Sequence, residues 1–108
     1  MNYLPRIEEI LLIAIWKLAD QAYGSAILKQ VEQDTGTTWM SGAVYGALTR
    51  LLKQEYVKSR KETTKRTNVG RPRIYYSITS EGIEKLAKVQ KINQRLWVGV
   101  PELKTKKQ

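Results

Sequence analysis

The segment from Tyr56 to Thr79 places the strongest constraint on the fold of this chain. Two stretches, 56–62 and 73–78, flank a long polar connection, and in the second Ile74, Tyr76 and Ile78 recur at every other position. Alternation with a period of two is typical of paired β-strands. The connection, residues 63–72, contains glycine, proline and a single apolar residue, Val69, and it is too long for a two-residue turn. We therefore predict a hairpin with an extended loop, the form of the wing in a winged helix.

The same segment carries most of the positive charge of the chain. From Arg50 to Arg73 there are nine Lys and Arg residues against Glu55 and Glu62, a local charge of +7 in a chain whose net charge is +9. Cations gathered in one segment suit a polyphosphate partner, because each one placed near a phosphate releases condensed counterions. A charge run can instead be a solvated face that maintains solubility. Its position directly after a predicted helix favours contact with nucleic acid.

The loop presents two arginines on a stiffened backbone. Pro72 lies between Arg71 and Arg73 and restricts the backbone to an extended form, so two guanidinium groups are presented with little loss of entropy. Extended arginine side chains suit the minor groove and its flanking phosphates. The candidate DNA contacts in this segment are Lys65, Arg66, Arg71 and Arg73.

Composition excludes most catalytic functions. The 108 residues are enough for one domain, and they include no Cys and no His. Thiolate and imidazole ligands for zinc, a thiol nucleophile and a histidine general base are therefore all absent. The carboxylates do not gather, and four of them, Glu8, Glu9, Glu81 and Glu84, are expected on helix surfaces near N-termini. We expect no metal site, no cofactor and no enzymatic activity.

No segment suits a membrane. The longest mostly apolar run, residues 10–16, is far shorter than the roughly 20 residues that a membrane span requires, and no charged-then-apolar signal segment precedes it. The expected location is the cytoplasm.

Three helices are predicted before the hairpin. Apolar residues at three- and four-residue spacing predict a first helix over Pro5–Leu18. Ser25 is the expected N-cap of a short second helix that Gly36 ends. Ser41 is the expected N-cap of a third helix over about residues 42–54.

The third helix has two different faces on a helical wheel. Val44, Leu48, Leu51 and Leu52 form an apolar face, and the opposite face changes along the helix from small to polar to basic. Small residues allow close approach to a groove, and the later side chains can hydrogen-bond or reach phosphate. Tyr45, at the boundary, either contacts a phosphate or completes the edge of the core. The candidate DNA contacts on this helix are Ser41, Gly42, Ala43, Tyr45, Thr49, Arg50 and Lys53.

A last helix is predicted from Ser80, capped by Thr79, to about Gly99. Its apolar residues are spaced 3, 4, 3 and 4 with Asn93 at the centre, which is a heptad seam whose polar residue tends to fix register or oligomeric state. The seam packs against either the first helix of the same chain or a second chain. An additional apolar face on the first helix favours a homodimer. The predicted interface contains Leu12, Ile13, Trp16, Leu86, Val89, Asn93, Leu96, Trp97 and Val100.

The predicted fold class is mainly α with a small β-hairpin, a winged helix-turn-helix plus a C-terminal dimerisation helix. Residues 1–79 are the predicted DNA-binding domain, residues 80–100 the dimerisation helix, and residues 101–108 a disordered basic tail.

The chain resembles the PadR family of bacterial transcriptional regulators. The likeness is spread over residues 7–87 and includes the apolar first helix, the tripeptide Ala22-Tyr23-Gly24, residues 42–51 (GAVYGALTRL) and residues 70–79 (GRPRIYYSIT), with Gly82 following. In the family, residues matching 42–51 form the recognition helix, and those matching 70–79 form the wing tip and its returning strand. Two departures are Ile74, where a basic residue is common, and the single C-terminal helix, which is similar to the short subfamily.

The resemblance implies a homodimeric, often ligand-responsive repressor that binds a palindromic operator in double-stranded DNA, one recognition helix and wing to each half-site. It also implies backbone contact near the start of the second helix. The residues to which it assigns DNA contact are Tyr23, Gly24, Tyr45, Thr49, Arg50, Arg71 and Arg73.

Some short members of the family enclose planar ligands between aromatic residues at the dimer interface. Trp97 flanks the heptad seam and Trp16 lies on the additional face of the first helix, so the resemblance implies a planar aromatic effector between them. The alternative is that both indoles bury area in the interface.

Two classes of function fit these features. The first is a sequence-specific transcriptional regulator. The second is a winged-helix dimer that acts as a protein-interaction or non-specific nucleic-acid-binding module, since a fold does not decide function. A wing rich in Arg and Lys favours the first.

Overall fold

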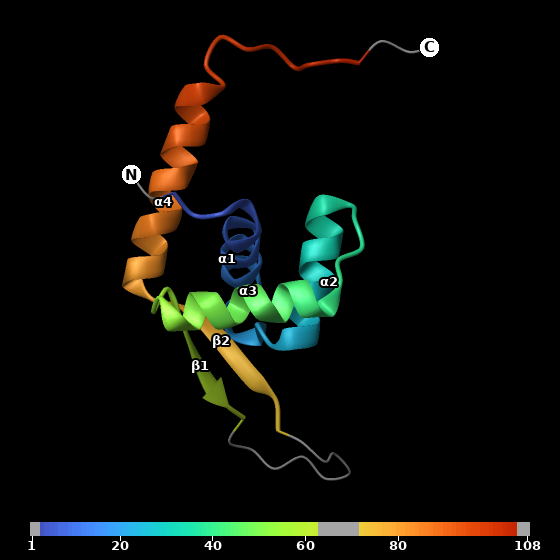
Figure 1. Cartoon of the computed structure of the whole chain (residues 1–108), viewed down its shortest axis with the longest axis vertical. Helices are drawn as coiled ribbons and strands as arrows, with labels where there is room; N and C mark the ends of the chain where they lie inside the picture. Colours follow the sequence, from blue (N-terminus) through green and yellow to red (C-terminus); the bar gives the residue numbers. More distant parts are fainter. Residues whose placement is uncertain (1–2, 63–71, 106–108) are drawn as a thin grey trace.

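The described part of the chain, residues 3–62 and 72–105 of a computed structural model, forms four α-helices and one hairpin. The predicted fold class is confirmed: a mainly helical chain with a two-stranded antiparallel hairpin in a winged helix-turn-helix. The elements in order are α1 (Arg6–Leu18), a short 3-10 turn η1 (Ala19–Gln21), α2 (Gly24–Thr35), α3 (Ser41–Lys53), β1 (Val57–Lys61), β2 (Ile74–Ile78) and α4 (Ser80–Leu96) (Figure 1).

Helix α1 is the centre of the packing. It contacts α2, α3, α4 and β2, and Figure 1 shows it between α2 and α4. One face of α1 buries Leu11, Ala14 and Ile15 against the apolar faces of α2 and α3. Leu12 is also completely buried in this core, so the expectation that it contacts a second chain is wrong. The residues that meet α1 in the core from α2 and α3 are Ile27, Val31, Val44, Ala47, Leu48 and Leu51.

Two of the three predicted N-caps differ in the structure. Tyr23 has an extended backbone and pairs with Tyr75 of β2, so α2 begins at Gly24 and Ser25 is already helical. The extended Met40 similarly precedes α3, which places Ser41 inside the first turn with no side-chain cap. Thr79 caps α4 as predicted: its hydroxyl oxygen accepts the backbone N–H of Gly82 at 3.0 Å.

The expectation that Glu8 and Glu9 lie on the helix surface is wrong. Their exposed fractions are 2% and 9%, because each carboxylate has a partner on a distant helix. Glu9 Oε2 accepts a hydrogen bond from Asn93 Nδ2 of α4 at 3.1 Å, and Glu9 Oε1 pairs with Arg6 at 3.2 Å. The polar residue of the heptad seam therefore bonds within its own chain.

The second half of α4 extends beyond the core. Leu86 packs against the core and Val89 is buried in it, whereas Leu96, Trp97 and Val100 are exposed. The helix ends at Leu96, three residues before the predicted end.

The wing strands pair in antiparallel register from Val57–Ile78 to Lys61–Ile74. Lys65, Arg66 and Arg71 of the predicted loop lie outside the described residues. No helix among residues 3–62 and 72–105 is long and apolar enough to cross a membrane.

Candidate nucleic-acid interface

Helix α3 is held by one face and presents the other to solvent. Its buried side consists of Val44, Ala47, Leu48 and Leu51. Each residue predicted to contact DNA from this helix is exposed: Ser41, Gly42, Ala43, Tyr45, Thr49, Arg50 and Lys53. The outward face therefore has the composition that its pattern predicts.

Thr49 hydrogen-bonds to the backbone of Tyr45, one turn earlier in α3. The Thr49 hydroxyl donates to the backbone carbonyl of Tyr45 at 2.9 Å, which leaves the hydroxyl lone pairs free to accept a hydrogen bond from a base amino group. The Tyr45 ring lies against the start of α2, where Gly24 leaves room for it, because a Cβ on Gly24 would collide with the phenol. Tyr45 thus packs between two helices while 43% of it stays exposed.

Arg50 is held by a carboxylate from inside the core. Its Nε donates to Glu8 Oε2 at 3.0 Å, and 54% of the Arg50 side chain remains exposed. The two residues are 42 positions apart, so no local pattern in the sequence indicates this pair.

A stack of tyrosines and arginines joins the wing to the start of α2. The Tyr23 and Tyr75 rings meet edge to face, with centroids 5.5 Å apart. The guanidinium carbon of Arg73 lies 4.1 Å from the Tyr23 ring centroid, and that of Arg60 lies 4.5 Å from the Tyr75 centroid. The backbone N–H of Tyr76 donates to the carbonyl of Ala22 at 2.8 Å, which fixes the wing against this turn.

The environment of Arg73 favours its charged form. A hydrogen bond with Tyr75 is the main effect that raises the pKa of Arg73, and Tyr23, Tyr75 and Glu62 add to it. The backbone N–H of Arg73 also donates to Glu62 Oε1 at 3.0 Å. Arg73 is therefore a fixed cation at the base of the wing.

Three cations on β1 were counted in the charge of this segment but were not among its candidate DNA contacts. Lys58, Arg60 and Lys61 are exposed, and Arg60 stacks on Tyr75, its cross-strand partner in the hairpin register. The charge of this strand was visible in the sequence, but the register that places Arg60 beside an aromatic ring was not.

Several cavities border α4. One, of about 530 Å³, is lined by Glu9, Ile13, Trp16, Leu86 and Asn93 among others, so the structure brings Trp16 to a cavity between α1 and α4. Trp97, which is 57% exposed, is absent from that lining.

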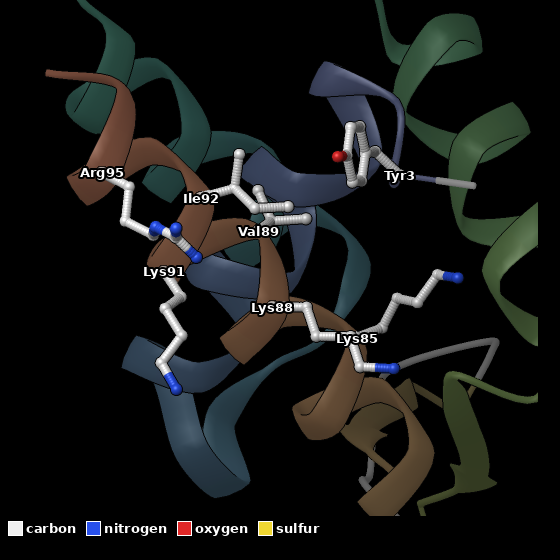
Figure 2. A pocket seen from close by; sticks show the side chains of 7 residues that line it. All are labelled: Tyr3, Lys85, Lys88, Val89, Lys91, Ile92 and Arg95. Atoms are coloured by element: carbon white, nitrogen blue, oxygen red, sulfur yellow. The ribbon is translucent and has the colours of Figure 1, made fainter. Parts of the chain in front are cut away.

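Another cavity, of about 450 Å³, has Tyr3, Val89 and Ile92 in its wall (Figure 2). Its basic residues are Lys85, Lys88, Lys91 and Arg95, and Figure 2 shows Lys91 directed away from Tyr3. These cations add positive charge to α4.

One family model matches most of the chain, and several solved structures have a similar fold. The sequence profile of the "Transcriptional regulator PadR-like family" matches residues 12–88. No curated protein is similar enough to the chain to count as a match. Among solved structures, a PadR family transcription regulator from Clostridium difficile R20291 is 29% identical, with a TM-score of 0.64 over 86% of this chain and 92% of that one. A transcriptional regulator from Clostridium thermocellum is 25% identical, with a TM-score of 0.66 over 89% and 90% of the two chains.

A PadR-like transcriptional regulator from Bacillus cereus has the same fold. It is 23% identical to this chain, with a TM-score of 0.70 over 87% of this chain and 86% of that one.

Proposed function

Because the chain belongs to the PadR-like family of transcriptional regulators, we propose that it is a sequence-specific DNA-binding regulator that acts as a homodimeric repressor. The observation that carries this proposal is the outward face of α3, which runs from small residues to Thr49, Arg50 and Lys53 on a helix whose other face is locked in the core. A rigid helix with a small and polar outer face suits the major groove.

The proposed contacts fall into two groups. Gly42, Ala43 and Thr49 face base edges, since their side chains are short or carry a hydroxyl. Ser41, Tyr45 and Lys53 at the ends and edge of the face bind phosphates. The proposed phosphate contact of the described part of the wing is Arg73, which stacks on Tyr23 at the start of α2, next to Gly24. Lys65, Arg66 and Arg71, which lie outside the described residues, are proposed for the same role.

The exposed apolar residues at the end of α4 support a dimer. Leu96, Trp97 and Val100 are exposed in the described part of a single chain, and Ile13 and Trp16 line an open apolar cavity on α1. We propose that residues 96–100 of one protomer cover the α1 face of its partner. Residues 1–79 then form the DNA-binding domain, and residues 80–100, which are α4 and the four residues after it, form the dimerisation segment.

The proposed effector is a planar aromatic molecule at this interface. The cavity beside Trp16 has a size suited to small ligands, and a partner's Trp97 would close it. The competing explanation is that the two indoles only bury area. Titration of planar aromatic compounds while Trp fluorescence is followed distinguishes the two, since an effector shifts the wild-type signal and Trp97→Ala removes the shift. Trp39, whose Nε1 donates to Thr35 Oγ1 at 2.9 Å in the α2–α3 connection, is retained in both proteins, so its emission is a background common to the two titrations.

The test of DNA binding is a gel shift with the DNA upstream of the protein's own gene, against unrelated DNA of equal length, over a series of salt concentrations. Retention of the upstream fragment at physiological salt, with loss of the unrelated one, supports an operator-reading regulator. Equal and steeply salt-dependent binding of both supports the alternative, a non-specific nucleic-acid-binding module. A regulator of this kind acts in the cytoplasm.

A further inference from the structure

The carboxylate of Glu8 is enclosed by the core and bonded through only one of its oxygens. The side chain, in the first turn of α1, has an exposed fraction of 2%. Oε2 accepts the hydrogen bond from Arg50 Nε at 3.0 Å, whereas Oε1 has no hydrogen-bond partner among the described residues. A buried charge with an unpaired oxygen costs stability.

The pair is made through a single N–H. Arginine–carboxylate pairs are frequently bidentate, with two parallel N–H groups, and such a pair would also satisfy Oε1. Arg50 instead uses Nε alone, and its terminal nitrogens make no hydrogen bond within the described part of the chain.

The free end of Arg50 lies on the outward face of α3. A Cβ built on Gly46 would lie 3.9 Å from Arg50 Nη1, so the guanidinium runs beside this glycine. Gly46 is on the same side of the helix as Gly42, Thr49 and Lys53. The two terminal nitrogens are therefore presented where the proposed function places DNA.

We propose that Glu8 is a specificity-determining residue that positions Arg50 to bind guanine. This inference rests on the proposed function. Held through Nε, Arg50 presents Nη1 and Nη2 to the O6 and N7 acceptors of a guanine in the major groove. Most of the rotamer entropy of the arginine is lost during folding, before DNA arrives, because its partner is fixed in the core.

The charge of Glu8 has a second effect. It compensates the positive charge of Arg50, so this arginine adds less to sequence-independent attraction to phosphate than a free cation does. The Glu8–Arg50 pair therefore raises the ratio of specific to non-specific binding affinity in two ways. It orients Arg50 toward guanine, and it lowers the attraction of Arg50 to phosphate.

The test compares Glu8→Gln with wild type in binding to a selected operator and to the same operator with each guanine replaced in turn. A good bidentate contact discriminates guanine from other bases by about 5- to 150-fold. Glu8→Gln is expected to lose most of that discrimination at one guanine per half-site. It is also expected to bind unrelated DNA more tightly, with a salt dependence steeper by up to about 0.9.

Glu9→Gln is the matched control. Glu9 is the adjacent buried carboxylate, but it bonds with Asn93 and Arg6 rather than with α3. This variant is expected to keep wild-type base discrimination whatever its stability, which a thermal melt of each variant records.

An unchanged guanine preference in folded Glu8→Gln overturns the proposal. A wild-type protein with no base preference at all would instead overturn the proposed function. If Glu8→Gln does not fold, wild type is tested on operators with 7-deazaguanine, which lacks the N7 acceptor. The proposal is supported if 7-deazaguanine at one position lowers the affinity of wild type but not that of the double variant Glu8→Gln/Arg50→Met, which lacks both charges. It is overturned if wild type keeps full affinity with 7-deazaguanine at every position.

Discussion

Replacement of Gly82 by alanine is expected to destabilise the protein because two backbone segments meet at this residue. Gly82 is the third residue of α4, it is buried, and its N–H donates to Thr79 Oγ1 at 3.0 Å. A Cβ at this position would collide with the backbone carbonyl oxygen of Tyr56 and would lie 2.9 Å from Cγ2 of Ile78. The Tyr56 carbonyl itself accepts the N–H of Thr79 at 3.0 Å, so neither side can move away without breaking a hydrogen bond.

The magnitude follows from two opposing effects. Overpacking costs about 1–3 kcal/mol, and the upper half of that range applies because the obstacle is backbone. Alanine gains at most about 1 kcal/mol over glycine in a helix. The net loss is therefore about 1–2 kcal/mol, which corresponds to a fall in Tm of about 4–16 °C for a domain of this size.

Gly42→Ala is the matched control, since it is the same substitution in the first turn of another helix. No heavy atom lies within 4 Å of a Cβ at Gly42, and the residue is exposed. Here the gain in helix propensity is unopposed, and Tm is expected to rise by a few degrees, from about 0.5–1 kcal/mol of stabilisation.

Thermal unfolding followed by circular dichroism measures both variants at one protein concentration, because dimerisation makes Tm concentration-dependent. Equal shifts of the same sign in the two variants would refute the packing of α4 against the end of the α3–β1 connection.

Three further substitutions test other parts of the structure. Thr79→Ala removes the hydroxyl that caps α4 and donates to the Glu55 carbonyl at 2.7 Å, so urea denaturation should show a loss of about 0.5–2 kcal/mol that Thr79→Ser largely restores. Burial, with a contribution from Tyr45, raises the pKa of Tyr76. In the unfolded chain the same phenol ionises near pH 10. The stability due to this group is therefore complete below about pH 10 and is lost as the pH rises through the pKa of the folded state. Tyr76→Phe should flatten that alkaline loss in urea denaturation, and an unchanged pH profile would contradict the assignment. Lys53→Ala should weaken binding to all DNA alike and reduce the slope of affinity against salt by about 0.9, measured by fluorescence anisotropy, whereas an altered base preference would place Lys53 on a base edge.

The helices and the outward face of α3 could be predicted from the sequence because both depend on local periodicity. The pattern that placed Thr49 and Lys53 outward also placed Leu48 and Leu51 in the core, and the structure agrees at all four positions. A capping hydroxyl is also a local signal, but it identified only Thr79 of three predicted caps, since α2 and α3 begin after the extended residues Tyr23 and Met40.

The errors lie where a distant segment decides the local structure. Glu8 was expected on the surface, and its burial depends on Arg50, 42 residues later; that of Glu9 depends on Asn93, 84 residues later. The start of α2 is set by pairing of Tyr23 with Tyr75, which no signal around Ser25 indicates.

Burial of Leu12 illustrates a further difficulty. Periodicity shows that an apolar residue needs cover, but it does not show which element provides it. In the structure, Leu12 belongs to the chain's own core, whereas Trp16, one turn later on the same helix, is 65% exposed.

Selection of binding sites from a random pool of duplex DNA at physiological salt tests the central claim most directly. It requires no knowledge of the regulated genes. The account predicts enrichment of an inverted repeat with half-sites about one helical turn apart or a multiple of it, as expected of a two-fold dimer with one α3 in each major groove. A pool that stays random while the protein binds it would contradict sequence-specific recognition, and enrichment of a single, non-repeated site would contradict the dimer.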